Sequence, residues 1–490
     1  MKNRKQNSAN PPVKQGAGEK PAEANKINAS THYDFNAKNL TPYGGLFPVV
    51  TMLEKVGFQS LVEECLTVNR LTRAMPMSKF VLAIVLGLYV GFARLSQLRF
   101  MAKDPMLTGI LQVVALPGQS TFWRFLASLH INVQRQVLKL QRKLRERVWA
   151  AANVRLKSCT LDTDTTVHTL YGKQMGARKA YNPGKKGKKS YQPILTFLAE
   201  TREYLAGQLR NGNKPTGKQI ADHLAEAFQS IPETGVKRFA RADSGFYCWD
   251  AVEAYVKWDC KFVVVARKTA RLLEQLRKAD WKPSPMTDAD EECEFRYQPD
   301  GWKSEFRFVA LRYHDPEGDE EDEEGTEQEP AEQYQLFACG KVKYRVFVTN
   351  IETQPIDWVA WFYNRRAGAE NLIKEANNDV GLTAHPSGRF GMNANHFQLA
   401  MLAYNLNCWL LLFQRPEEET VETLKHTMLS TARLRFLFVA AKIWRHAGQT
   451  GISYGDHYEE QGLFHRLMSR LGRVVLPGEG FAPVIPVALE

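Results

Sequence analysis

The spacing of hydrophobic residues divides the chain into a helical first part and a second part rich in short strands. From Gly44 to about Val154, apolar residues recur at the spacing of helices. From Leu156 onward, short runs of Val, Ile, Leu, Thr and Phe are separated by Gly, Pro or Asn, which is typical of strands. In chain order we predict strands at 158–161, 193–198, 204–209, 238–242 and 261–266, with helices at 218–231 and 249–258. This order of elements predicts a mixed α/β sheet.

Later segments interrupt and then complete the predicted sheet. A β-rich insertion is predicted from strand-like runs at 294–297, 305–313, 334–338 and 343–349, and helical spacing returns at 357–380 and 396–413. The predicted regions are a disordered basic tail at 1–39, a helical N-terminal region at 40–155, the first part of the α/β core at 156–267, the insertion at 268–350, the second part of the core at 351–415, and a helical C-terminal region with a Pro-rich tail at 416–490.

Charge is distributed unevenly along the chain. The 490 residues carry a net charge of +12, yet the segment 315–332 holds eleven acidic residues and no Lys or Arg. The remainder of the chain is therefore more basic than the net charge suggests, which indicates a polyanionic partner such as nucleic acid or an anionic membrane surface. The acidic segment itself is interpreted as a solvated loop, with mimicry of DNA charge as the alternative.

Several classes of protein are disfavoured by composition. The most apolar stretch, Phe80–Ala93, has 14 residues, and about 20 are needed to span a bilayer, so we expect no membrane span. No apolar segment follows the basic residues at the N-terminus, so no secretory signal is expected. The seven cysteines are widely spaced, which fits reduced thiols in a cytoplasmic protein better than a zinc site or a disulfide framework.

Acidic residues at the end of the first predicted strand are the first candidate for chemistry. Asp162 and Asp164 alternate with threonines, so in an extended strand both side chains project to the same face. Two like charges on one strand face repel each other and are costly to bury without a cation. The alternative is that the strand ends at Leu161 and both aspartates lie in a turn.

Asp243 is the second candidate. A short predicted strand at 238–242 leads directly into it, and Ser244 and Gly245 end the strand. In open α/β sheets, ligand-handling residues gather at the carboxyl ends of strands. The alternative interpretation is an ordinary turn or a helix N-cap.

The third candidate is a polar stripe on the helix predicted at 357–380. At 100° per residue, five side chains fall within about 80° of one another: Tyr363, Arg366, Glu370, Lys374 and Asn377. A solvated helix face is the ordinary explanation of such a stripe. The strongly apolar segment that follows, however, suggests that this helix packs against a core, where an acid beside cations can combine a metal ligand with phosphate contacts.

Three carboxylates within a basic chain suit metal-dependent chemistry on DNA. Mg²⁺ prefers carboxylate oxygens, waters and phosphates as ligands. Two such ions activate the attacking oxygen and stabilise the leaving oxygen in a displacement at phosphorus. The sequence contains no His-Glu-x-x-His, Gly-x-Ser-x-Gly or phosphate-binding-loop motif that would favour other catalysis.

At the level of motifs, the sequence resembles DDE-type transposases of bacterial insertion sequences. Within the superfamily of insertion sequence four, it is most similar to the insertion sequence thirteen-eighty group. The resemblance covers roughly residues 45–470, and its motifs are Leu116-Pro-Gly-Gln-Ser-Thr-Phe-Trp-Arg-Phe-Leu, Asp162-Thr-Asp-Thr-Thr, Leu205-Ala-Gly-Gln-Leu-Arg-Asn-Gly-Asn213, Arg241-Ala-Asp-Ser-Gly, and the spacing of Tyr363, Arg366, Glu370 and Asn377.

This resemblance implies an RNase H-like core and a metal-binding triad. The family's triad falls on Asp243, Glu370 and one aspartate of the first strand. We assign that position to Asp164, which two hydroxyl residues follow, with Asp162 as the alternative. The resemblance implies two Mg²⁺ ions, with Mn²⁺ as a substitute. It also implies a cut-and-paste reaction on double-stranded DNA, at transposon ends and target, by a synaptic homodimer associated with the bacterial nucleoid.

Further residues are assigned to DNA binding. By the resemblance, Tyr363, Arg366 and Asn377 contact the DNA backbone near the transposon end, and Lys374 lies on the same helix face. A basic segment at 173–189, without any acid, is expected to be a hairpin loop beside the active site, and phosphate contacts from such a loop would be salt-dependent. The other residues assigned to DNA are Lys185, Lys186, Lys188 and Lys189 of that loop, Arg210, Arg124 on a helix expected to begin with Ser120 as N-cap, and Trp302, an aromatic expected to be exposed and to stack on a flipped base.

Two other functions remain open at this point. One is a DNA-binding derivative of a transposase that has lost catalysis. The other is an RNase H-like nuclease that cuts DNA without joining the 3′-end to a target.

Overall fold

The computed structural model describes residues 27–68, 75–180, 182, 184–232, 235–286, 288–314, 342–416, 419–421 and 424–475. The chain divides into two units, residues 1–38 and residues 39–490. Residues 27–38, the described part of the first unit, are exposed turns and irregular backbone. The remainder of the predicted tail, the acidic segment at 315–332 and the strand predicted at 334–338 lie outside the described residues.

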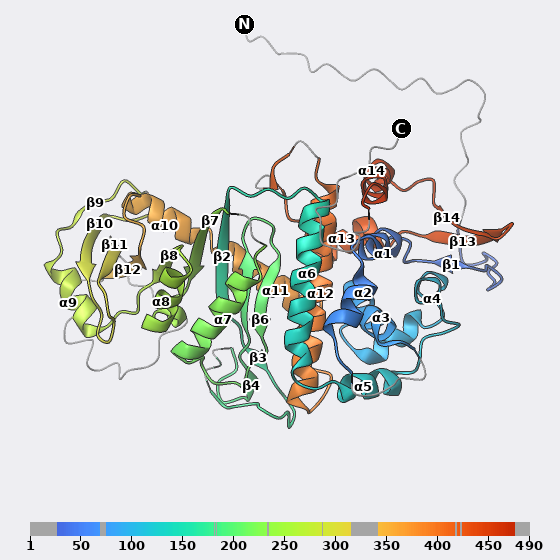
Figure 1. Ribbon diagram of the computed structural model, residues 1–490, viewed down its shortest axis with the longest axis horizontal. Helices are drawn as coiled ribbons and strands as arrows, with labels where there is room; N and C mark the ends of the chain where they lie inside the picture. The colour runs from blue at the N-terminus through green and yellow to red at the C-terminus, as the bar shows by residue number, and fades with distance from the viewer. Residues whose placement is uncertain are drawn as a thin grey trace, which may run out of the picture. The chain divides into compact units, whose positions relative to one another are not determined.

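A nine-stranded mixed sheet forms the centre of the second unit (Figure 1). Its strand order is β6-β5-β2-β7-β8-β12-β11-β10-β9. The strands are β2 (Ser158–Thr165), β5 (Ile194–Leu198), β6 (Tyr204–Gln208), β7 (Lys237–Ala242), β8 (Cys260–Val265), β9 (Lys282–Pro283), β10 (Glu291–Tyr297), β11 (Phe306–His314) and β12 (Val342–Thr349).

The first five strands have the arrangement of an RNase H-like core, which confirms the predicted fold class. β2, β5 and β6 form an antiparallel meander, and β7 and β8 follow in parallel on the other side of β2. These strands lie where the hydrophobic runs predict them, except that β2 continues past Leu161 to Thr165. Asp162 and Asp164 therefore belong to the strand itself, and the turn interpretation is wrong.

The segment predicted as an insertion extends the same sheet. β12 pairs antiparallel with β8, and β11, β10 and β9 follow outward in antiparallel order. Its apolar side chains join the cores on both faces of the sheet: Phe308 lies in the main core, whereas Val309 lies in a smaller cluster with Val359 and Ala360 of the neighbouring helix.

Helices cover both faces of the sheet and form most of the remaining described part of the second unit (Figure 1). They are α1 (Leu46–Lys55), α2 (Phe58–Cys65), α3 (Met77–Val90), α4 (Pro105–Leu111), α5 (Gln119–Ser128), α6 (Val133–Ala151), α7 (Gly217–Gln229), α8 (Trp249–Lys257), α9 (Ala270–Lys278), α10 (Ile356–Asn364), α11 (Ala367–Asp379), α12 (Phe390–Gln414), α13 (Leu429–Ala432) and α14 (Gln461–Gly472). α5 begins after Gly118 as N-cap, so the predicted Ser120 cap is wrong.

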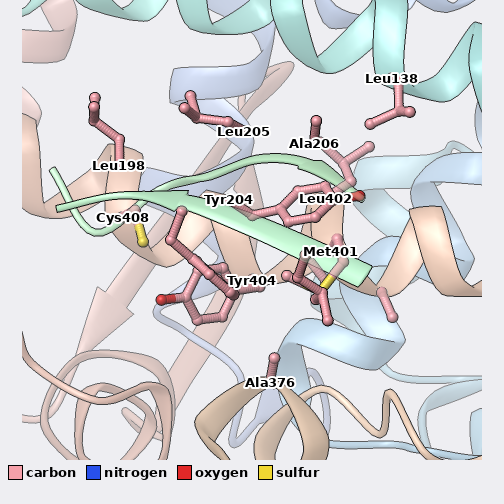
Figure 2. Close-up of a cluster of buried hydrophobic side chains, with 14 of the residues drawn as sticks. Leu138, Leu198, Tyr204, Leu205, Ala206, Ala376, Met401, Leu402, Tyr404 and Cys408 are labelled. Carbon is pink, nitrogen blue, oxygen red and sulfur yellow. The ribbon is translucent and has the colours of Figure 1, made fainter. Parts of the chain in front are cut away.

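The junction between the helical region and the sheet is a continuous core. Figure 2 shows the strands that carry Leu198 and Tyr204 between Leu138 of α6 on one side and Ala376 of α11 on the other. Nearly every residue of the 25-residue helix α12 is buried, because α12 contacts α3, α6 and β6 at once. Burial on all sides explains why α12 has no solvated polar face.

A buried ion pair crosses this junction. The side chain of Glu203 accepts hydrogen bonds from Arg145 Nε of α6 (3.2 Å), from Trp149 Nε1 of the same helix (2.8 Å) and from Trp409 Nε1 of α12. Arg145 and Glu203 are both fully buried. Arg145 therefore belongs to the interior and does not face solvent, although α6 is rich in Arg and Lys.

The C-terminal region, predicted to be helical with a Pro-rich tail, also contains strands. β13 (Ala441–His446) and β14 (Gln449–Tyr454) form a hairpin, and β1 (Leu40–Thr41) pairs with β13. Ala447 and Gly448 both have positive φ, as a two-residue hairpin turn requires. Each strand has only six residues, too few for strand alternation to be distinguished from the helical spacing of the neighbouring segments.

In the described part of the chain, no single helix is long and apolar enough to cross a membrane. α3 and the 3₁₀ helix Leu95–Met101 together have the length and composition of a span, but they are bent by 87° relative to each other.

Candidate active site

A buried ion pair lies between the two central parallel strands. Arg241 of β7 donates from Nε and Nη2 to the two carboxylate oxygens of Asp162 on β2, at 2.6 and 2.7 Å. Its Nη1 donates to the main-chain oxygen of Phe362 in α10, at 2.9 Å. Asp162 is therefore paired and buried, and through Arg241 it ties the sheet to α10.

Asp164 and Asp243 occupy the next positions on the same face of these strands. β2 and β7 run in parallel with Asp162 opposite Arg241 and Thr163 opposite Ala242, so the register places Asp164 beside Asp243. Asp243 follows the last residue of β7, keeps an extended backbone (φ −77°, ψ −177°) and accepts from Gly245 N at 3.0 Å. Neighbouring strands are about 4.8 Å apart, so the two carboxyl groups are close neighbours at the carboxyl edge of the sheet.

The long helix predicted at 357–380 is broken. α10 ends at Asn364 and α11 begins at Ala367, with Arg365 and Arg366 between them. Tyr363 thus belongs to a different helix from Glu370. No Gly or Pro occurs at the break, which is why the sequence pattern does not reveal it.

Arg366 joins the carboxylates of the strands to Glu370. Its Nη1 lies 3.3 Å from Asp164 Oδ2 and 3.1 Å from Glu370 Oε1. Arg366 is buried, whereas the side chain of Glu370 is 64% exposed. The structure therefore brings together Asp164, Asp243, Arg366 and Glu370, whose positions in the chain are up to about two hundred residues apart.

Electrostatics at this site favour the presence of a cation. Burial raises the pKa of Asp164 to about 7, Arg366 opposes the rise, and the charge of Asp243 adds to it. Burial also raises the pKa of Asp243, again against the charge of Arg366. For Arg366, burial works against the charged form, but Asp164 and other acidic neighbours raise its pKa above the ordinary value. Because the charge of Asp243 raises the pKa of Asp164, a positive charge close to both would favour their ionised forms.

The candidate ligands are of the chemical type that binds a hard divalent cation. All three candidate ligands are carboxylates, the ligand type that Mg²⁺ and Mn²⁺ prefer. As they stand, no three His, Cys, Asp or Glu side chains among the described residues are grouped closely enough to hold a metal ion. At this site Arg366 Nη1 lies between two of the candidate ligands.

The other residues of the predicted stripe have different surroundings. Tyr363 is buried, and its ring packs on Phe347 with a centroid distance of 5.0 Å. Lys374 is exposed on α11. Asn377 Oδ1 lies 3.0 Å from His168 Nε2, and burial lowers the pKa of His168 to about 3, so a neutral His168 donates to Asn377.

The basic loop begins just beyond the carboxyl end of β2. β3 (His168–Thr169) and β4 (Ser190–Tyr191) pair at its base, three residues after β2 ends, and Figure 1 shows both beyond that end of the sheet. The four lysines assigned to DNA are all exposed: Lys185, Lys186, Lys188 and Lys189. The hairpin between β2 and β5 is therefore where the sequence predicts it.

Arg124 and Arg210 differ in accessibility. Arg124 is exposed on α5, with Nη2 donating to Thr121 at 3.2 Å. Arg210 is buried, and it donates to Gln219 Oε1 at 2.6 Å and to the main-chain oxygen of Asn213 at 3.1 Å. In this arrangement Arg210 supports the loop after β6.

Trp302 is buried, so the prediction that it is exposed is wrong. Only 7% of the residue is accessible, because its ring packs against Tyr247, Trp249 and Phe306. It lines a cavity of about 500 Å³ between the core and the insertion strands. Other residues that line this cavity are Tyr247, Trp249, Tyr297, Arg267 and Arg271.

Two residues of this site are not predicted by sequence reasoning. Arg241 lies within one of the motifs, yet its pairing with Asp162 was not expected, although a cation one strand away is the usual neutraliser of a buried aspartate. Arg267, just after β8, is exposed and close enough to lower the pKa of Asp243, against the larger effect of burial. The sequence signal for Arg267 is its position just after β8, the strand that pairs with β7.

Comparison with known proteins identifies the family of the chain. Residues 23–476 match the family described as transposase DDE domain group 1. The chain belongs to this transposase family. Members of this family are enzymes of DNA phosphoryl transfer that generally use divalent metal ions, which agrees with the predicted class of protein.

Among solved structures, the chain is similar to piggyBac transposase in a cryo-EM structure of its synaptic complex with hairpin DNA. The TM-score is 0.39 at 11% sequence identity, with 89% of this chain and 86% of that chain covered. A search of the curated proteins finds no match.

Proposed function

We propose that the chain is a cut-and-paste DNA transposase whose catalytic residues are Asp164, Asp243 and Glu370. The observation that carries this proposal is the register of β2 and β7, which sets Asp164 beside Asp243, with Arg366 linking Asp164 to Glu370. Strand ends and one helix supply the three acids, as metal-dependent displacement at phosphorus requires.

Asp164, Asp243 and Glu370 would hold the divalent cations, Mg²⁺ or Mn²⁺. When bound, a pair of such ions activates an attacking oxygen and stabilises the leaving one. Asp162 is the weaker candidate for a ligand, because both its oxygens already accept from Arg241. Its proposed role is to position α10, and through α10 the segment that carries Arg366 and Glu370.

The DNA backbone would run across the carboxyl edge of the sheet. Arg366 offers a guanidinium for a phosphate, Lys374 is exposed one turn beyond Glu370, and the basic loop begins a few residues after Asp164. Phosphate contacts of this kind fix the position of DNA without reading its sequence. Arg124, exposed on α5, is the proposed contact to the terminal repeat. Asn377 and Tyr363 would support this surface from the interior, because Tyr363 is buried and Asn377 is hydrogen-bonded to the buried His168.

The aromatic cavity beside Asp243 suits an unpaired base. Trp302 and Tyr247 form its wall and Arg267 supplies positive charge for a phosphate, whereas Arg271 is paired with Asp300. Trp249 is partly accessible there and is the better stacking surface, whereas Trp302 supports it from inside. A cavity of about 500 Å³ has room for a base, and stacking of this kind accompanies extrusion of a nucleotide from a duplex.

The reaction would cut one strand at each transposon end with water, and the freed 3′-hydroxyl would then attack the opposite strand and later the target DNA. Two copies of the chain would act together on paired ends. Binding without cleavage would indicate the inactive derivative, and cleavage without joining would indicate the nuclease.

The test is cleavage and strand transfer on duplexes that carry the terminal repeats of the element encoding the chain. We expect Asp164→Asn, Asp243→Asn and Glu370→Gln each to abolish both reactions while end binding is retained. Asp222→Asn is the matched control, because Asp222 is an exposed carboxylate on α7. Near-normal cleavage by any of the first three variants would remove that residue from the catalytic set.

A further inference from the structure

Arg366 occupies the position where a cation would meet the strand and helix carboxylates. One nitrogen, Nη1, is within hydrogen-bond distance of Asp164 Oδ2 and of Glu370 Oε1 at the same time. The guanidinium is buried, with 7% of its side chain exposed, and so is the carboxylate of Asp164, with 12% exposed. A charged hydrogen bond in such surroundings is strong, because solvent screens it little.

The same oxygens cannot serve Arg366 and a metal ion together. A divalent ion bound to Asp164 and Glu370 would lie about 2.0–2.1 Å from their oxygens. It would therefore take the place that Nη1 holds between them, and two positive groups would compete for one pair of carboxylates. Entry of the metal requires that Arg366 leave.

Phosphate is the partner that an arginine leaving this site would take. A guanidinium binds phosphate through two parallel hydrogen bonds, which a carboxylate reached by one nitrogen does not match. Arg366 lies between α10 and α11, at the edge where the proposed function places the DNA backbone. DNA would therefore remove Arg366 from Asp164 and Glu370 and leave both free for metal.

We propose that Arg366 is the counter-ion of the metal-free site, and that binding of DNA phosphate and of divalent cation are coupled because both require Arg366 to leave Asp164 and Glu370. This inference rests on the proposed function and adds its regulation: the chain acquires its metal tightly only on DNA. Coupling of two binding equilibria is reciprocal, so metal should tighten DNA binding by the same factor.

The experiment measures Mn²⁺ binding by electron paramagnetic resonance, which reports free Mn²⁺, on the full chain with and without a saturating duplex oligonucleotide of mixed sequence. For the wild-type chain we expect the duplex to tighten Mn²⁺ binding by a factor in the range of about 5–150, the usual size of coupling between two sites. Arg366→Gln should bind Mn²⁺ more tightly than the wild type without DNA, and the duplex should add little.

Arg365→Gln is the matched control. Arg365 is the preceding residue, carries the same charge, and lies over the ring of Trp361 at 4.9 Å, away from the carboxylates. It should bind Mn²⁺ like the wild type, with the full effect of DNA. If Arg365→Gln bound Mn²⁺ as tightly as Arg366→Gln, the loss of any positive charge nearby would explain the effect, and the inference would be overturned.

Failure of the inference and failure of the proposed site give different results. If Asp164→Asn loses Mn²⁺ binding but Arg366→Gln binds no more tightly than the wild type, only the role of Arg366 is overturned. If Asp164→Asn binds Mn²⁺ like the wild type, the proposed metal site itself is wrong. The wild-type comparison with and without duplex needs no variant, and the absence of coupling there overturns the inference even if Arg366→Gln does not fold.

Discussion

Arg241 and Asp162 form a bidentate ion pair inside the sheet, one step of the parallel register before Asp164 and Asp243. Because of this pair, Asp162 and Asp164 have different surroundings although they share a strand face. Asp162 is neutralised by a buried cation, which also contacts α10 through Phe362, whereas Asp164 faces another acid. The resemblance to transposases alone left these two positions open.

Removal of Asp162 should destabilise the fold more than removal of Asp164. Asp162→Ala leaves Arg241 buried without its partner, so we expect a loss of about 3–5 kcal/mol in the free energy of unfolding. Asp164→Ala should cost less, because it also removes a desolvated carboxylate and leaves Arg366 in contact with Glu370. Urea unfolding of both variants measures this. The double variant Asp162→Ala/Arg241→Met should lose less than the sum of the single variants, and simple additivity would show that the pair contributes nothing.

Stability of the metal-free protein should depend on pH through Asp164. Its pKa is about 7 in the folded chain against an ordinary 3.8, so between these values the folded state holds a proton that the unfolded state has lost. The free energy of unfolding therefore decreases as pH rises from about 4 to about 7. In urea unfolding with a chelator present, Asp164→Asn should lack this part of the decrease. Equal pH dependence of wild type and variant would contradict the burial-driven shift.

The sequence predicted the strands of the core better than the helices beside the site. The strands of the core follow from short apolar runs, and the edge position of Asp243 follows from the Ser-Gly that ends β7. The sequence left open whether β2 extends through Asp164, because an isolated strand would not bury Asp162. Only the register that brings Arg241 opposite makes that burial possible.

Other features depended on contacts between distant segments. The break between α10 and α11 has no Gly or Pro to mark it, and tertiary packing of Tyr363 against Phe347 holds the end of α10. Trp302 follows Gly301 in a turn, a position typical of an exposed residue. Two of the three aromatic residues that cover it, Tyr247 and Trp249, come from a segment more than fifty positions earlier. Local sequence patterns carry no information about such partners.

The basic loop should supply salt-dependent affinity for DNA. Replacing Lys185, Lys186, Lys188 and Lys189 with Gln should weaken duplex binding and flatten the dependence of log K on log salt by about 0.9 for each phosphate that the loop no longer neutralises. Fluorescence anisotropy over a salt series measures both. Lys257→Gln with Lys261→Gln is the control, because these exposed lysines lie at the opposite edge of the sheet. An unchanged slope in the loop variant would exclude the loop from the DNA interface.

The junction of the helical region with the core should depend on Glu203. Glu203→Ala would leave Arg145 buried without a counter-charge and two indole N–H groups without an acceptor. Loss of one member of a buried ion pair costs about 3–5 kcal/mol. Thermal unfolding should show a lowered midpoint, whereas Glu253→Gln, an exposed acid paired with Lys303, should change it little. A midpoint unchanged by Glu203→Ala would contradict the buried network.

The most direct test is the location of Mn²⁺ by anomalous X-ray diffraction in crystals of the chain grown with a DNA duplex. We predict anomalous density in contact with carboxylate oxygens of Asp164, Asp243 and Glu370, with Arg366 moved away from both Asp164 and Glu370, and with Asp162 still paired to Arg241. Density at other residues, or at Asp162 in place of Asp164, would contradict the proposed active site.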